Sequence, residues 1–196
     1  PLGYESKTTL SDMVLGKRVR LSYGGLQRDR HGRALAQVYV LNDKDQAVLW
    51  VQEQMIRTGM ARLYTWPDTW QDTDKLIKAE RRARDARFGL WAHEKYAVRG
   101  TAPDALAQDV DSFQLVQGVV TSVADKREFI YINFGSDYKT DFTVAIARKD
   151  KRRILAAGLD PMTLEGAMVR VRGWVEMTNG PLIWLDHAER FEVLGE

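Results

Sequence analysis

The sequence predicts an α+β protein in which β-barrels carry helices, arranged as two successive modules. Short segments in both halves alternate apolar and polar residues with the period of two that strands show. Other segments repeat apolar residues at spacings of three and four and end at a glycine, which is typical of helices. The charge balance also changes: residues 1–100 hold 18 basic and 12 acidic side chains, whereas residues 101–196 hold 11 and 15.

The composition excludes several protein classes. With 44% apolar and 29% charged residues, the chain is not of the disordered type. Cysteine is absent, so disulfide frameworks and thiol nucleophiles are excluded. No apolar run reaches the roughly 20 residues that a membrane-spanning helix needs, so we expect no membrane segment. The net charge of +2 does not indicate a binding partner, and the composition does not indicate a cellular compartment.

The first half begins with a helix and two strands. Residues 5–15 have helical apolar spacing and stop at Gly16. Residues 17–23 and 34–41 alternate, which predicts a two-stranded hairpin with a long basic loop. Residues 42–45 then supply turn chemistry.

Two helices are expected next. From about Leu49 the apolar spacing becomes helical, and Gly59 marks the expected end. Asp68 and Gln71 have the spacing of a capping box, which predicts the start of a second helix that runs to about Leu90. Residues 99–111 lack periodicity and separate the modules, so the predicted domains are 1–98 and 112–196 with a linker between them.

The second half predicts five strands and one helix. The helix covers Arg148–Gly158, between the third and fourth strands, and this order is that of a five-stranded OB-like barrel. Asn179-Gly180 predicts a tight hairpin between the last two strands, because both residues adopt positive φ angles readily. The strands cover residues 115–123, 129–134, 141–147, 168–176 and 182–185, with a further extended stretch near 191–194.

Three motifs in the first half occur in an order that is typical of one family. They are D-R-H-G-R-A-L-A-Q-V-Y-V from residue 29, I-R-T-G-M-A-R-L-Y from residue 56 and A-E-R-R-A-R-D-A-R-F-G-L-W from residue 79. With them, residues 4–98 resemble the later part of a staphylococcal nuclease-like (thermonuclease) domain. The resemblance implies a five-stranded OB-type barrel with three helices and, in active members, hydrolysis of DNA or RNA phosphodiesters with bound Ca²⁺.

The resemblance also implies that the chain holds only part of such a domain: the first helix, the last two barrel strands and the other two helices. In the family, the unmatched amino-terminal strands and loop bring the metal-binding aspartates, the general-base glutamate and one of two phosphate-binding arginines. No Ca²⁺ ligand is therefore assigned, and the chain is expected to be inactive alone. Because a partial barrel leaves a sheet edge uncovered, a preceding segment or a second chain is expected to complete it.

Arg33, the last residue of the D-x-x-G-R motif, is the residue that matches an active residue of the family. In active members this guanidinium contacts the scissile phosphate, a role that suits its planar fork of donors. The alternative is a rim arginine that is solvated or paired with Asp29. Asp29 is expected to shape the turn, and His31 to be solvated.

Tyr64 and Trp66 fall near a family segment whose aromatic residues line the nucleotide pocket. They are candidates for stacking on a base, with core packing as the alternative. A basic run on the second helix would track a phosphate backbone or form a solvated face paired with its acidic neighbours. That run consists of Arg81, Arg82, Arg84 and Arg87.

The second half resembles the OB-like extension of some bacterial thermonuclease-family proteins through Y-I-N-F-G-S-D, D-F-T-V-A-I and V-R-V-R-G-W-V. Its candidate nucleic-acid contacts are Arg170, Arg172 and Trp174, which share one strand face beside Tyr131 and Trp184. Structural packing is the alternative, because this half is acidic overall. A basic cluster at residues 148–153 would meet nucleic acid, the first module or solvent.

The sequence therefore predicts a thermonuclease-family protein that binds and hydrolyses DNA or RNA with Ca²⁺ when its domain is complete. The alternative is a non-catalytic scaffold that keeps a degenerate nuclease fold and binds nucleic acid or protein. Substrate preference and oligomeric state stay open.

Overall fold

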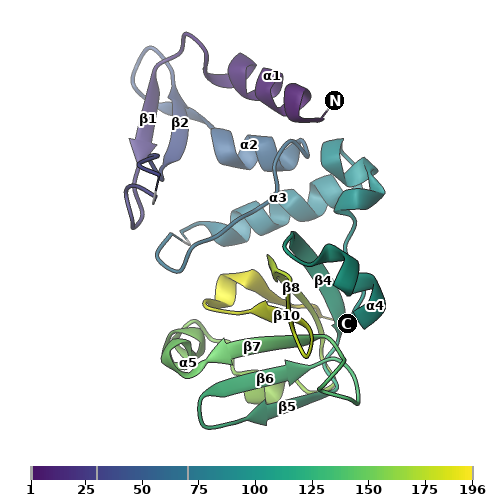
Figure 1. Ribbon diagram of the computed structural model, residues 1–196. Coiled ribbons are helices and arrows are strands. Elements are labelled where there is room, and N and C mark those ends of the chain that lie inside the picture. Colours follow the sequence, from purple (N-terminus) through teal and green to yellow (C-terminus); the bar gives the residue numbers. More distant parts are fainter. Residues whose placement is uncertain (1, 30, 70, 196) are drawn as a thin grey trace. The chain divides into compact units, whose positions relative to one another are not determined.

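The computed structural model describes residues 2–29, 31–69 and 71–195 (Figure 1). The chain forms two compact units, Pro1–Tyr96 and Ala97–Glu196. Helices and three sheets occur together, so the α+β class is confirmed, but the described strands close no barrel. No helix among these residues is both long and apolar enough to cross a bilayer.

The first unit opens with helix α1 (Leu2–Val14) and an antiparallel sheet in the order β1–β2–β3. β1 (Val19–Ser22) pairs with β2 (Gln37–Leu41), as predicted. β3 (Ala47–Trp50) is a third strand, so the prediction of a two-stranded hairpin is wrong. This short apolar run leads directly into a helix, and periodicity alone did not separate the two elements.

Two α-helices and two short 3₁₀ helices complete this unit. They are α2 (Val51–Arg57), α3 (Thr73–Asp85), η1 (Gly89–Ala92) and η2 (Glu94–Tyr96). Leu76, Ala79 and Ala83 of α3 are buried, which matches the predicted apolar face. The predicted capping box is wrong, because the N-cap is Asp72.

The second unit contains the remaining eight strands in two sheets, ordered β5–β6–β7–β10–β9 and β11–β8–β4. β7 and β10 run parallel, whereas every other pair in these sheets is antiparallel. β4 and β5 are consecutive, so the chain passes directly from one sheet to the other. The strands are β4 (Phe113–Val119), β5 (Ser122–Asp125), β6 (Phe129–Asn133), β7 (Thr143–Ala147), β8 (Met168–Trp174), β9 (Glu176–Thr178), β10 (Gly180–Trp184) and β11 (Phe191–Val193).

Helix α5 (Arg148–Ala156) connects β7 to β8, as the sequence predicts, and buries Ile154 in the core of this unit. The predicted tight hairpin joins β9 to β10. Only Asn179 has a positive φ angle there, 64°, so the expectation that Gly180 shares it is wrong. Short 3₁₀ helices, η4 (Pro161–Thr163) and η5 (Ala188–Arg190), precede β8 and β11.

Residues 99–111, which the composition suggested to be a linker, are structured. They form α4 (Pro103–Leu106) and η3 (Ala107–Asp109), and Leu106 is fully buried in the core of the second unit. Arg99 pairs with β4 like a short strand: its N–H donates to Leu115 and its carbonyl accepts from Gln117, both at 2.8 Å.

Candidate functional site

The loop between β1 and β2 is built around one carboxylate. Asp29 Oδ1 accepts the backbone N–H groups of His31 at 2.8 Å and Arg33 at 2.9 Å. The Gly32 N–H donates to the Asp29 carbonyl, and the Asp29 N–H donates to the Arg33 carbonyl, both at 3.0 Å. These bonds confirm that Asp29 shapes the turn.

The same carboxylate holds the Arg33 side chain by one edge. Arg33 Nε donates to Asp29 Oδ2 at 2.6 Å. The Arg33 side chain is 76% exposed, whereas that of Asp29 is only 9% exposed. This pairing with Asp29 is what we expect if Arg33 is a rim arginine without a role in catalysis. It also fixes the direction of the guanidinium while the terminal nitrogens face solvent, where they would donate to an anion.

The contacts around Asp29 change its acidity. Burial by itself would raise the pKa of this carboxyl, but the hydrogen bonds from the Arg33 backbone and guanidinium and from the His31 N–H outweigh it. Together they lower the pKa of Asp29 to about 2. The loop therefore keeps its central anion ionised at physiological pH.

We predict that acid loosens this loop only well below the ordinary titration range of an aspartate. Because the folded pKa of Asp29 is about 2 and the unfolded value is about 3.9, its stabilising effect is complete above about pH 4 and is lost as the pH falls toward 2. The amide NMR shifts of His31 and Arg33 should change with pH with a midpoint at the folded pKa of Asp29, and Arg33→Ala should raise this midpoint. A midpoint near 4 in the unsubstituted protein would contradict the contacts described.

A second segment, residues 62–69, lies against the start of this loop. The Leu26 N–H donates to Asp68 Oδ2 at 2.7 Å, and Gln71 Nε2 donates to the Gly24 carbonyl at 3.2 Å. A Cβ atom at Gly25 would overlap the Asp68 backbone, so the close approach requires glycine. The hydrogen bonds of Asp68 and Gln71 thus link the segment before α3 to the loop after β1, which is why these side chains do not cap α3.

The docked segment carries the two predicted aromatic candidates. The rings of Tyr64 and Trp66 are in contact, with centroids 5.2 Å apart and planes at 57°. The two residues are 40% and 42% exposed, so both are partly open to solvent. The structure therefore brings the Arg33 loop and this aromatic pair into neighbouring parts of one unit.

Glu80 of α3 contacts this segment, and it is one of the acidic neighbours that the sequence analysis expected to pair with the basic run of this helix. It is fully buried on α3, and Oε1 accepts the Leu63 N–H at 2.9 Å. Arg84 lies 3.7 Å from Glu80 Oε2, and its guanidinium lies over the Trp91 ring, 5.7 Å from the centroid. An acidic residue on the apolar face of a predicted helix is the signal that would have indicated its burial.

The candidates on β8 lie in the second unit, where charge pairing occupies two of them. Arg172 is 1% exposed and pairs with Glu192 of β11, 7% exposed, at 2.7 Å. Arg170 Nη2 donates to Gln117 at 2.6 Å. Trp174 is half-exposed and meets Phe113 edge to face. Nucleic-acid contact by these residues stays a prediction, and the geometry gives both arginines a structural role.

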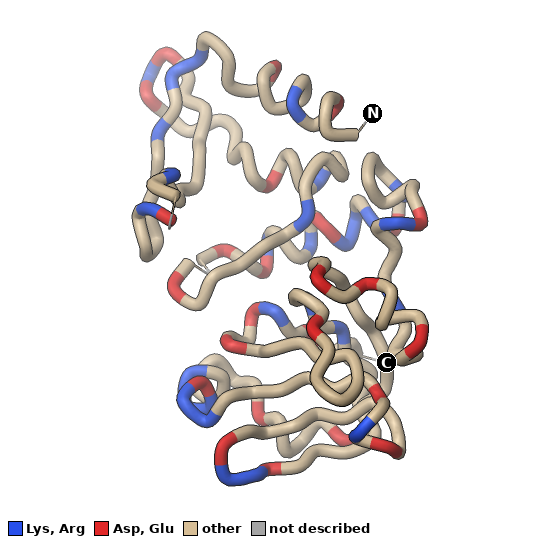
Figure 2. Tube along the Cα trace, in the orientation of Figure 1, with Lys and Arg blue, Asp and Glu red and all other residues tan. Residues whose placement is uncertain are grey.

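The other predicted basic surfaces are partly neutralised. In Figure 2 the basic residues of α5 form a dense group, but Arg148 and Lys151 both bind Asp125, at 2.6 and 2.9 Å. Arg153 binds Asp150 at 2.7 Å. These pairs favour the interpretation of α5 as a structural and solvated face.

A metal centre does not emerge from the part of the chain that the structure describes. Within residues 2–29, 31–69 and 71–195, no three side chains of the ligating types gather closely enough to hold an ion. Ca²⁺ usually takes six to eight oxygen ligands, so these residues do not fit the ion that the resemblance implies.

The first unit thus defines a class of domain: a small twisted sheet backed by helices, with an arginine-bearing hairpin loop beside an aromatic segment. Comparison with known proteins makes the class specific. Residues 1–93 match the family described as staphylococcal nuclease homologue. They are an SNase-like nuclease domain, as the three motifs indicated.

Several of the relatives found by sequence are named as nucleases, and all of these are distant. A probable endonuclease, lcl3, of Pyrenophora tritici-repentis is 34% identical over 110 residues, 53% of this chain and 38% of the relative. The SPbeta prophage-derived endonuclease YokF of Bacillus subtilis is 28% identical over 100 residues, 50% of this chain and 32% of the relative. A thermonuclease of Staphylococcus hyicus is 23% identical over 93 residues, 47% of this chain and 52% of the relative. The matches therefore cover about half of this chain and at most about half of these proteins.

Proposed function

We propose that this protein hydrolyses phosphodiester bonds of DNA or RNA with Ca²⁺ when the nuclease domain is complete. The observation that carries the proposal is Arg33: its Nε donates to Asp29 while its side chain stays 76% exposed. It lies within the segment that matches the nuclease family.

Arg33 would act on the phosphate. Its planar donors suit a phosphoryl group that gains negative charge as water attacks, and the anchored guanidinium needs little reorganisation when the substrate arrives. The carboxylate that activates the water and the ligands of Ca²⁺ would come from residues outside this sequence. Ca²⁺ enters the proposal through the family match alone.

Tyr64 and Trp66 would hold a base beside that phosphate. Each ring is half-exposed, and their mutual contact limits the conformational freedom that binding would remove. Stacking on aromatic rings tolerates any base, which suits a nuclease without strict sequence preference.

The β1 edge is the place where further strands would join. β1 is an edge strand of its sheet, and its residues Val19 and Leu21 are 40% and 45% exposed. An exposed strand with apolar side chains favours pairing with another strand. We propose that a segment outside residues 1–196, or a second chain, completes the barrel there.

The second unit would be an OB-like barrel that assists binding. Supporting this interpretation, β4 and β5 are consecutive but belong to different sheets, β7 and β10 pair in parallel, and α5 lies between β7 and β8. This arrangement matches the order predicted for a five-stranded barrel with one helix. We propose domains 1–98 and 112–196, with 99–111 packed on the second.

The second candidate function is a non-catalytic scaffold for nucleic acid or protein. It is favoured by one observation: the described residues bring together no metal-binding cluster. Tight binding of nucleic acid by the protein from its natural source, with no cleavage in Ca²⁺, would identify this function.

We predict that residues 1–196 alone do not hydrolyse nucleic acid. The purified chain, incubated with labelled DNA or RNA and Ca²⁺, should release no shorter products, because the proposed water-activating carboxylate is not part of it. Cleavage that requires Ca²⁺ and disappears in Arg33→Ala would refute the incomplete-site account. Cleavage that persists in Arg33→Ala identifies a contaminating nuclease, and the preparation is then repurified.

A further inference from the structure

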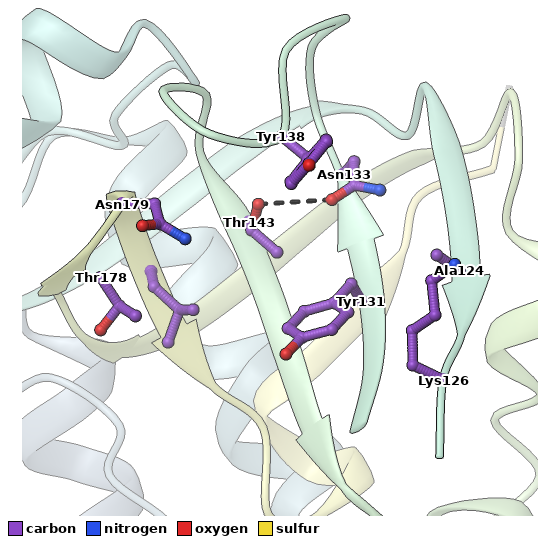
Figure 3. A pocket seen from close by; sticks show the side chains of 9 residues that line it. Ala124, Lys126, Tyr131, Asn133, Tyr138, Thr143, Thr178 and Asn179 are labelled. Atoms are coloured by element: carbon purple, nitrogen blue, oxygen red, sulfur yellow. Dashed lines mark hydrogen bonds between the residues drawn. The ribbon is translucent and has the colours of Figure 1, made fainter. Parts of the chain in front are cut away.

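The second unit contains a cavity that no part of the proposed nuclease site uses. It has a volume of about 430 Å³ and lies on one face of the β5–β6–β7–β10–β9 sheet (Figure 3). This volume falls within the roughly 300–1,000 Å³ of typical small-ligand sites. The walls are the loop between β6 and β7 on one side and the β9–β10 hairpin on the other.

Close backbone contacts at two glycines shape these walls. A Cβ atom at Gly135 would overlap the Asp141 carboxylate, and a Cβ atom at Gly180 would overlap the backbone of Thr140 and Asp141. The β6–β7 loop therefore packs directly against the start of β10. Asp141 Oδ2 also accepts the Asp137 N–H at 2.7 Å, which closes that loop on itself. The backbone of the β6–β7 loop and of the start of β10, held by these contacts, thus forms the sides of the cavity.

The floor and sides combine an aromatic ring with oriented amides. Tyr131 lies on β6 next to Asn133, and Asn133 Oδ1 accepts the Thr143 hydroxyl at 3.4 Å (Figure 3). Asn179 faces the same space from the hairpin. The Asn179 side chain forms no hydrogen bond with the residues that the structure describes, so its donor and acceptor are available to a ligand. A ring for stacking beside an amide suits a nucleobase.

The charges around the cavity favour a polyanion. Lys126 lines one end, and Lys139 Nζ lies 6.0 Å from the ring centroid of Tyr138, which lines the other. Neither lysine has a carboxylate partner among the residues described. The nearby acid Asp125 is already bound by two cations of α5, whereas Asp137 and Asp141 accept backbone N–H groups within their own loop and keep their charge. The two free ammonium groups would face phosphates on either side of a bound base.

We propose that this cavity binds an unpaired base of a single-stranded nucleic acid, with the base stacked on Tyr131 and the flanking phosphates near Lys126 and Lys139. A base within a duplex is already stacked and cannot enter, so single strands are preferred over duplexes. The inference stands on the second unit and does not depend on hydrolysis by the first.

The site is tested with the full chain carrying Arg33→Ala, so that binding at the first unit does not dominate. The probe is a labelled single strand of about 12 nucleotides, within the size range that such surfaces cover. The titration is run in EDTA and followed by fluorescence anisotropy. Tyr131→Ala should weaken binding about tenfold, and Tyr131→Phe, which keeps the ring, should restore it.

Two lysine variants test the proposal even if Tyr131→Ala fails to fold. Lys126→Glu should weaken binding severalfold, whereas Lys149→Glu, an equal charge change on the exposed part of α5, should have a much smaller effect. Photo-crosslinking with a bromouracil-substituted strand should then label a peptide that contains Tyr131. Equal loss in the two lysine variants, crosslinks confined to the first unit, duplex binding as tight as single-strand binding, or no binding would each overturn the proposal.

Discussion

Replacing Arg33 by alanine is expected to lower the rate of phosphodiester hydrolysis by the protein from its natural source by about 10²- to 10³-fold. The guanidinium is anchored by Asp29 and open at its terminal nitrogens, so its removal takes away donors that meet developing negative charge. Arg33→Lys should lose nearly as much, because an ammonium group cannot reproduce a planar fork. The measurement is kcat/KM on a labelled oligonucleotide in Ca²⁺.

Arg18→Ala is the matched control for that experiment. Arg18 is also an exposed arginine of the first unit that pairs with an aspartate, Asp45, at 2.8 Å. Because it lies at the opposite end of β1 from the Arg33 loop, its loss should leave kcat/KM within about twofold, as expected for a surface ion pair. Equal losses in the two variants would remove the special role assigned to Arg33.

The largest expected effect on stability is at the buried pair of the second unit. Glu192→Ala should lower the free energy of unfolding of this unit by about 3–5 kcal/mol, since it leaves the guanidinium of Arg172 buried without its carboxylate. The double variant Arg172→Met with Glu192→Leu should recover part of that loss, because it removes the buried pair but leaves the charge of Arg170, whose Nη1 lies 3.6 Å from Glu192 Oε2.

Hydrogen exchange of peptides from β4 and β8 measures this effect in the second unit alone. Glu165→Ala, the same change at an exposed site, should alter the free energy of unfolding by no more than about 0.5 kcal/mol. If Glu192→Ala were as mild as Glu165→Ala, the pair would not carry the structural role described for Arg172.

Much of the fold was predictable because local patterns determined it. The helix before Gly16, the alternating β1 and β2, and the apolar face of α3 all follow from spacing in the sequence. Asp29 was predictable as a turn residue because its bonds reach only two and four residues along the chain. The family resemblance of the first half depended on motifs of the same local kind.

The sequence was least informative where distant residues decide the outcome. Asp68 was assigned to a helix cap because its partner, Leu26, lies 42 residues away in the sequence. For Arg172 the sequence left nucleic-acid contact and structural packing both open, because its partner Glu192 is in a strand whose register the sequence does not specify; nucleic-acid contact stays a prediction. Leu106 occurs in a stretch with linker composition, yet the second unit buries it. The cavity beside Tyr131 also depends on long-range packing, because residues of β6 and of the β9–β10 hairpin line it together.

The central claim is that the first unit belongs to a working nuclease, and one measurement addresses it directly. The protein is isolated from its natural source and incubated with DNA and with RNA, in Ca²⁺ and in EDTA, and the products are resolved by size. We expect cleavage of phosphodiester bonds in Ca²⁺ and none in EDTA. Tight binding without cleavage under both conditions would contradict the nuclease account and establish the scaffold function instead.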